Sequence, residues 1–286
     1  MPDLEGRTPF PAKLQLVDIY VKIAYSSCNV NGTWSDLQCV ELFHLHVLRL
    51  LGTGPDKAHV ALKGGCNLRY FFGSVRYSAD MDLDVGRALE PHVLKERMNR
   101  LLSGPALVTG LRAAGMDIGR VSAPKQTDTT QRWKVELVPH HRSSISLHTK
   151  IEFSRRTTGE HAVLEAVLPE ISATYQLLPL LVRHYPAEAA LRQKLGALVG
   201  RAAVQARDVF DLGVLLGRVR DPRRALQGER AALRAGIERA MDVSFDDYRG
   251  QVVAYLHPDH AGMYGSRPAW DALQARVIDA LEKASA

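Results

Sequence analysis

Three aspartates at alternating positions are the residues of this chain whose types and spacing are best suited to chemistry. Side chains of an extended strand alternate between its two faces. One face of a strand over residues 78–85 would therefore carry Ser78, Asp80, Asp82 and Asp84, and the other Met81, Leu83 and Val85. Three carboxylates in one row repel each other unless a cation lies between them or water screens them. Such oxygen ligands suit Mg²⁺ or Mn²⁺, which in turn bind substrate phosphates.

A Gly-Gly pair precedes this strand. Gly64 and Gly65 follow Lys63, and residues without Cβ let backbone N–H groups come close to a triphosphate. Each feature alone has a purely structural interpretation, because alternating aspartates can keep an edge strand soluble and Gly-Gly is common in turns. The two together at this spacing favour a nucleotide-transfer site.

Composition limits the class of protein. The 286 residues suffice for one large domain or two smaller ones. No segment approaches the roughly 18 consecutive apolar residues of a membrane span, and the N-terminus has no signal-peptide pattern, so we expect a cytoplasmic protein without a membrane partner. The three cysteines have no C-x-x-C spacing, which argues against a zinc site or a disulfide framework. A net charge of +6 favours a polyanionic partner.

Apolar periodicity predicts the elements around these motifs. We expect a pair of N-terminal helices over residues 13–25 and 36–51, with Ser35 or Asp36 as the N-cap of the second. A short strand over 60–62 leads into the Gly-Gly loop, and a helix over 66–72 returns the chain to the aspartate strand.

Further along the chain, residues 90–115 are expected to form one helix. Residues 132–138 and 147–154 alternate like two strands of a hairpin that extends the sheet. From about residue 187 the pattern is helical. The expected fold is α+β, a mixed sheet flanked by helices with a C-terminal helical domain, divided into residues 1–175 and 176–286.

Two further groups of polar residues have open interpretations. In the strand over 147–154, Glu152 is either another carboxylate of the metal site or a solvated residue paired with Lys150 or Lys134. Arg207, Asp208 and Asp211 share one side of a helix, and their spacing alone favours a surface pair between Arg207 and Asp211. The functional alternative is that Lys194 reaches a nucleotide phosphate while Asp211 orients it or an attacking hydroxyl.

Four motifs occur in a recognisable order. They are Lys63–Arg69 (KGGCNLR), Arg76–Asp84 (RYSADMDLD), Lys150–Ser154 (KIEFS), and Lys194-Leu195 followed by Arg207–Leu212 (RDVFDL). As a set they resemble the motifs of the AbiEii/AbiGii nucleotidyltransferase toxins. These are the toxin halves of type IV toxin–antitoxin pairs, are similar in fold to DNA polymerase β-type nucleotidyltransferases, and include mycobacterial toxins that add nucleotides to the acceptor end of tRNA. The resemblance spans about residues 60–216.

The resemblance implies roles for individual residues. The expected catalytic residues are Asp80, Asp82, Lys194 and Asp211. The expected nucleotide-binding residues are Lys63, Gly64, Gly65, Arg76, Ser78 and Asp208. Asp80 and Asp82 would bind Mg²⁺ or Mn²⁺, with Glu152 as a further ligand.

We therefore expect a metal-dependent nucleotidyltransferase toxin that transfers a nucleoside monophosphate from an NTP to RNA, at the 3′ acceptor end of tRNA, and so blocks translation. A cognate antitoxin would be a further partner. One alternative is transfer to a small-molecule or protein hydroxyl. The other is a catalytically silent fold that binds RNA or a partner, against which the intact Asp80-x-Asp82 pair argues.

Overall fold

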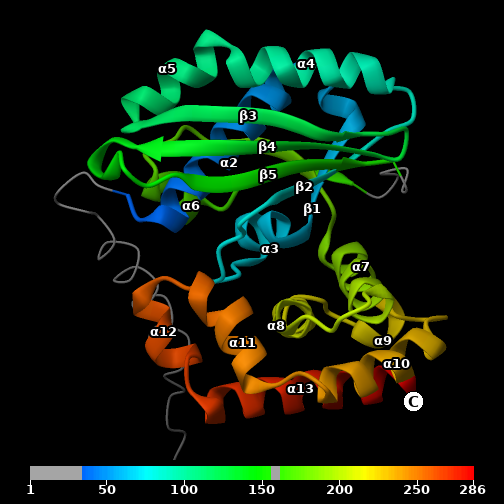
Figure 1. Ribbon diagram of the computed structural model, residues 1–286. Helices are drawn as coiled ribbons and strands as arrows, with labels where there is room; N and C mark the ends of the chain where they lie inside the picture. The colour runs from blue at the N-terminus through cyan, green and yellow to red at the C-terminus, as the bar shows by residue number, and fades with distance from the viewer. Residues whose placement is uncertain (1–33, 156–161) are drawn as a thin grey trace, which may run out of the picture.

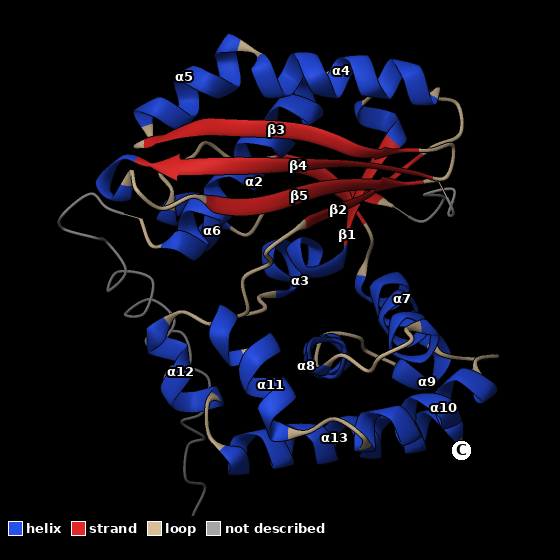
Figure 2. Ribbon diagram, viewed as in Figure 1, coloured by secondary structure: helices blue, strands red, loops and turns tan. Residues whose placement is uncertain are grey.

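A seven-stranded mixed sheet and a separate group of helices make up the computed structural model, which describes residues 34–155 and 162–286. Figures 1 and 2 show the sheet above and most C-terminal helices below. The strand order is β3-β4-β5-β2-β1-β7-β6. The strands are β1 (Val60–Lys63), β2 (Met81–Val85), β3 (Met116–Gln126), β4 (Thr130–Pro139), β5 (Leu147–Ser154), β6 (Val163–Ala166) and β7 (Leu181–His184). The expected α+β class is confirmed, and the helix expected over 13–25 lies outside the described residues.

The helices of the sheet part are α2 (Asp36–Thr53), α3 (Gly64–Phe72), α4 (Pro91–Ser103), α5 (Pro105–Ala113) and α6 (Pro169–Thr174). Of the two predicted N-cap candidates, Ser35 is the N-cap of α2: its hydroxyl accepts the Gln38 N–H, and the Gln38 side chain accepts the Ser35 N–H in return. The single helix expected over 90–115 is wrong. Gly104 precedes Pro105 and has an extended backbone (ψ 145°), because a proline disfavours the helical conformation in the residue before it.

Hydrophobic burial on one side of the sheet fixes the direction of the side chains. Met81, Leu83 and Val85 are at most 1% exposed and belong to a core shared with α2, α4 and α5. Trp133 and Phe153 pack edge to face in the same core. The polar residues of β2 and β5 therefore lie on the opposite face.

Three strands were not predicted. β3 shows no regular alternation in burial, and β6 and β7 have only four residues each. β7 pairs in parallel with β1 through Leu62 and His184, so the sheet includes residues beyond 175, the expected domain boundary.

The remaining helices pack around a second core built on Phe210, Tyr248 and Trp270. They are α7 (Ala187–Gly200), α8 (Ala206–Leu216), α9 (Pro222–Ala225), α10 (Arg230–Met241), α11 (Phe245–Gln251), α12 (Pro258–Tyr264) and α13 (Arg267–Ser285). Leu68 of α3 is buried in this second core, whereas Cys66 and Tyr70 of the same helix belong to the first. Helix α3 thus connects the two parts. In the described part of the chain, no helix has the length and apolarity needed to cross a membrane.

Candidate active site

The polar face at the start of β2 carries two of the three aspartates of the expected row. Asp80 lies directly before β2 and Asp82 within it, and the Ser78 hydroxyl donates to the Asp80 carbonyl at 2.8 Å, which fixes this approach to the strand. Asp84 differs, because it is only 2% exposed and bonds to Lys63 and to the Tyr185 hydroxyl. The expected row of three is therefore corrected to a pair, and Asp84 is a buried structural carboxylate.

Glu152 supplies a third carboxylate from the neighbouring strand. Parallel pairing of β2 with β5 sets Asp82 opposite Glu152. The Arg132 guanidinium donates to Glu152 with Nε 2.6 Å from Oε2, while Lys150 pairs with Asp80 at 2.6 Å. The expectation that Glu152 pairs with Lys150 or Lys134 is wrong; its counter-ion is Arg132, which no spacing in the sequence indicated.

The Gly-Gly pair begins α3 against this aspartate strand. Gly64 has a φ of +69°, and a Cβ there would lie 2.8 Å from the Asp82 carboxylate. A Cβ on Gly65 would lie 2.6 Å from the Ser78 hydroxyl oxygen. Both positions require glycine because the end of the helix packs directly on the polar residues of the site.

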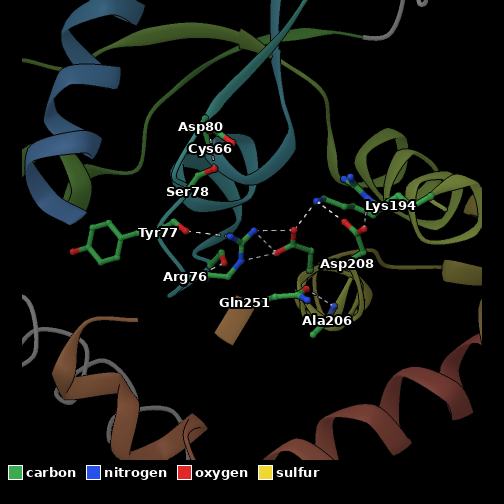
Figure 3. Close-up of polar contacts among 12 residues, drawn as sticks. Cys66, Arg76, Tyr77, Ser78, Asp80, Lys194, Ala206, Asp208 and Gln251 are labelled. Atoms are coloured by element: carbon green, nitrogen blue, oxygen red, sulfur yellow. Dashed lines mark hydrogen bonds and ion pairs between the residues drawn. The ribbon is translucent and has the colours of Figure 1, made fainter. Parts of the chain in front are cut away.

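A buried ionic network connects this region to the helical part, as Figure 3 shows for Arg76, Lys194 and Asp208. Arg76 donates from Nη2 to both oxygens of Asp211, at 3.1 and 3.0 Å. Lys194 Nζ lies 2.6 Å from Asp211 Oδ2 and 3.3 Å from Asp208 Oδ1. Arg201 bonds the other oxygen of Asp208 at 2.7 Å.

The electrostatics of Asp211 follow from this network. Burial alone raises the pKa of its carboxyl, but the charges of Arg76 and Lys194 outweigh burial and hold the pKa below its usual range. The expected surface pair between Arg207 and Asp211 is wrong, because Asp211 is fully buried and bonds elsewhere. Asp208 and Asp211 of α8 thus fix the side chains of three cations by ion pairs: Arg76, Lys194 and Arg201.

A cavity of about 360 Å³ lies between the start of β2 and helices α7, α8 and α11. The predicted residues that line it are Gly65, Arg76, Ser78, Asp80, Asp82, Glu152 and Lys194. Lys63, Gly64, Asp208 and Asp211 are not among its lining residues. Gly64 lies against Asp82, and Asp208 and Asp211 pair with Lys194. Lys63 pairs with Asp84, which does not line the cavity either. The cations that line it are Arg76, Arg132, Lys150, Lys194, Arg201 and Arg207, and they outnumber the three carboxylates.

Part of the cavity wall was missed in the sequence analysis. Gln205, Gln251 and Tyr255 line the cavity, and they come from segments without motif character. Gln251 accepts the Ala206 N–H at 2.8 Å, and the Tyr255 carbonyl accepts the Tyr77 N–H at 2.8 Å. Only the packing of α11 on α8 and on the approach to β2 brings them here.

The donor set fits a divalent cation held partly by substrate. Burial, together with the nearby charges of Asp80 and Glu152, raises the pKa of Asp82 despite Lys63 and Lys150. The positive charges of Lys63 and Lys150 therefore do not offset burial and the two neighbouring carboxylates, and a bound divalent cation would stabilise the ionised form of Asp82. In the part of the chain that the structure describes, no three His, Cys, Asp or Glu side chains form a complete metal cage. Mg²⁺ is usually bound by one or two carboxylates plus substrate phosphates and water, which Asp80 and Asp82 can provide.

Comparison with known families decides the identity of the chain. The model of the family described as nucleotidyl transferase AbiEii toxin, type IV toxin–antitoxin system, matches residues 47–283. The chain belongs to the AbiEii nucleotidyltransferase toxin family. It is a nucleotidyltransferase, as the ordered motifs predicted, and the match includes every residue of the cavity wall.

Solved structures of similar fold include members from two organisms. MenT4, a nucleotidyltransferase toxin from Mycobacterium tuberculosis, is 19% identical with a TM-score of 0.56, over 92% of this chain and 89% of that one. JHP933 from Helicobacter pylori is 17% identical with a TM-score of 0.51, over 88% and 96% of the two chains. A putative nucleotidyltransferase from H. pylori is 18% identical with a TM-score of 0.50, over 86% and 96%. A comparison with the curated proteins found no match.

Proposed function

We propose that this AbiEii family member transfers a nucleoside monophosphate from an NTP to the 3′ end of RNA, with the acceptor end of tRNA as its substrate. The observation that carries the proposal is the division of charge in the cavity. All three carboxylates that line the cavity, Asp80, Asp82 and Glu152, come from the sheet part, whereas the charged lining residues of the helical part, Lys194, Arg201 and Arg207, are all cations. This arrangement suits a triphosphate that bridges a metal and a basic wall.

Asp80 and Asp82 would hold Mg²⁺ or Mn²⁺, with Glu152 as a further ligand. A divalent ion there would stabilise charge on the triphosphate and lower the pKa of the attacking hydroxyl. Lys150 pairs with Asp80, and Arg132 pairs with Glu152. These two side chains therefore place positive charge where a metal would bind. We expect metal and these side chains to compete for the same oxygens.

Arg76 and Lys194 would bind the phosphates. Arg76 and Lys194 are 6% and 11% exposed and are both fixed by Asp211, which leaves their remaining N–H groups little freedom. Prepositioned cations stabilise charge that builds on a leaving pyrophosphate without reorganisation. In this proposal Asp211 and Asp208 are positioning residues, and Lys194 acts on the phosphate.

RNA as the acceptor rests on charge and on family. The cavity wall is rich in cations, and the whole chain carries a net charge of +6, as a polyanionic substrate requires. The structural neighbour MenT4 is a nucleotidyltransferase toxin, and the motifs resemble toxins that act on tRNA. Modification of tRNA would stop translation, and an antitoxin would then be needed to restrain the enzyme.

The test is transfer of label to RNA. Purified protein is incubated with Mg²⁺, total tRNA and each α-labelled NTP in turn, beside an Asp80→Asn variant and tRNA whose 3′ end has been oxidised. We expect label from one NTP on intact tRNA, and none with the variant or the oxidised tRNA. Label on a protein or small molecule instead would replace RNA as the acceptor, and no label with any acceptor would favour a silent binding fold.

A further inference from the structure

Among the residues that the structure describes, no helix covers the face of β3 to β5 beside the cavity, which is called the uncovered face below. Figure 2 shows α2 behind strands β3 to β5 and α4 and α5 above them, with no described helix in front. Trp133 and Ile151 point to the helix-covered core and are fully buried. Side chains one residue away, among them Arg132, Lys134 and Lys150, therefore lie on the uncovered face.

Like charges stand directly opposite each other on this face. Lys134 of β4 pairs in register with Lys150 of β5. Arg132 of β4 pairs in register with Lys125 of β3. Directly opposed like charges destabilise an antiparallel pair of strands, and two such pairs side by side call for an explanation outside the sheet.

Carboxylates compensate only half of this charge. Lys150 is paired with Asp80 and Arg132 with Glu152, both in the cavity. Neither Lys125 nor Lys134 takes part in an ion pair among the residues that the structure describes. These two cations also do not line the cavity. The cationic face thus begins at the carboxylates of the site and continues outward across β4 to β3.

We propose that Lys125 and Lys134, with Arg132 and Lys150, bind the phosphodiester backbone of the acceptor RNA and direct its 3′ end into the cavity. The inference rests on the proposed function and names the surface for its acceptor. An NTP or a small acceptor would be confined to the cavity. Only an extended polyanion spans both the cavity and the two outer lysines, and successive phosphates along one chain match a row of cations on neighbouring strands.

The test measures RNA binding without chemistry. Lys125→Gln/Lys134→Gln is compared with Lys95→Gln/Arg100→Gln, which removes the same charge from exposed residues of α4 on the other side of the sheet. Labelled tRNA is titrated with each protein by fluorescence anisotropy, with Mg²⁺ and no NTP, at several salt concentrations. Thermal unfolding is recorded for both variants, and we expect no loss of stability on Lys125→Gln/Lys134→Gln because the change relieves repulsion.

We expect the Lys125→Gln/Lys134→Gln variant to bind tRNA on the order of tenfold more weakly at low salt, with the control unchanged. The slope of log K against log salt should decrease by about 0.7 to 0.9 for each lost phosphate contact. Equal binding by wild type and this variant would overturn the inference and leave transfer to RNA standing. Variant-sensitive binding without any transfer of label would overturn the proposed function alone. A wild type that binds no RNA would overturn both.

Discussion

Arg76 and Asp211, 135 residues apart, form a two-pronged buried ion pair between the approach to β2 and helix α8. Arg76 is 6% exposed and Asp211 is fully buried. The pair joins the sheet, which carries the carboxylates, to the helical part, which carries Lys194. The geometry of the cavity therefore depends on contacts between the two parts of the chain rather than on either alone.

Removal of one member of this pair should destabilise the fold strongly. Asp211→Asn would leave Arg76 and Lys194 buried without their shared counter-charge, a change that typically lowers the free energy of unfolding by about 3–5 kcal/mol. Urea unfolding measures it. Asp246→Asn, an exposed aspartate of α11, is the matched control and should shift stability by less than about 0.5 kcal/mol. Equal effects of the two substitutions would contradict the structural role of Asp211.

The same pair predicts a pH dependence. The folded-state pKa of Asp211 is lowered, so its contribution to stability is present above the unfolded pKa of about 3.9 and is lost as pH falls toward the folded value. The difference in unfolding free energy between wild type and Asp211→Asn should be constant near neutral pH and shrink below about pH 4. Denaturant titrations at successive pH values measure this difference, and one that stays the same down to pH 3 would rule the linkage out.

Asp82, unlike Asp211, should lower the stability of the fold at neutral pH while being required for activity. Its pKa is raised by burial and by the neighbouring carboxylates, so its ionised form disfavours folding at neutral pH and the penalty decreases as pH falls. Asp82→Asn should keep or raise the melting temperature in EDTA while transfer activity is lost. Mg²⁺ with NTP should raise the melting temperature of wild type but not of the variant. A variant that melts well below wild type in EDTA would contradict this account.

Gly65 should tolerate no side chain without loss of activity. A Cβ there would lie 2.6 Å from the Ser78 hydroxyl oxygen and 3.2 Å from Arg76 Nη2, so Gly65→Ala should displace both side chains and reduce kcat/KM by at least about tenfold. Gly196→Ala in α7 meets no atom within 4 Å and should be neutral or slightly stabilising. The same clash should lower the melting temperature of Gly65→Ala, and adding Ser78→Ala, which removes the hydroxyl, should recover part of that loss. No such recovery would mean that the clash lies elsewhere.

Local patterns in the sequence predicted the elements whose side chains alternate or are capped. The alternation of apolar residues predicted β2, β4 and β5, and helical apolar spacing with the cap at Ser35 predicted α2. The site residues Gly65, Asp80 and Asp82 lie in two neighbouring sequence motifs. β3 was not predicted because its register on β4 shifts between Ile118 and Val121 and again between Ser122 and Lys125, which interrupts the alternation of its side chains. The break at Gly104 shows that a residue before proline can override helical periodicity.

The partners of Asp211 and of Glu152 could not be predicted from the spacing of residues in the sequence. Asp211 sits four residues after Arg207, which favoured a surface pair, whereas burial against the approach to β2 gives it Arg76 and Lys194 as partners. Arg132 reaches Glu152 only through strand register. Contacts of this kind arise from tertiary packing, and a single sequence records neither register nor packing.

The most direct test of the central claim compares α-labelled with γ-labelled NTP in the presence of tRNA and Mg²⁺. Nucleotidyl transfer at Asp80 and Asp82 predicts that the α label appears on RNA, that the γ label leaves as pyrophosphate, and that Asp80→Asn and Asp82→Asn abolish both. Transfer of the γ label to an acceptor, or undiminished transfer by either variant, would contradict it.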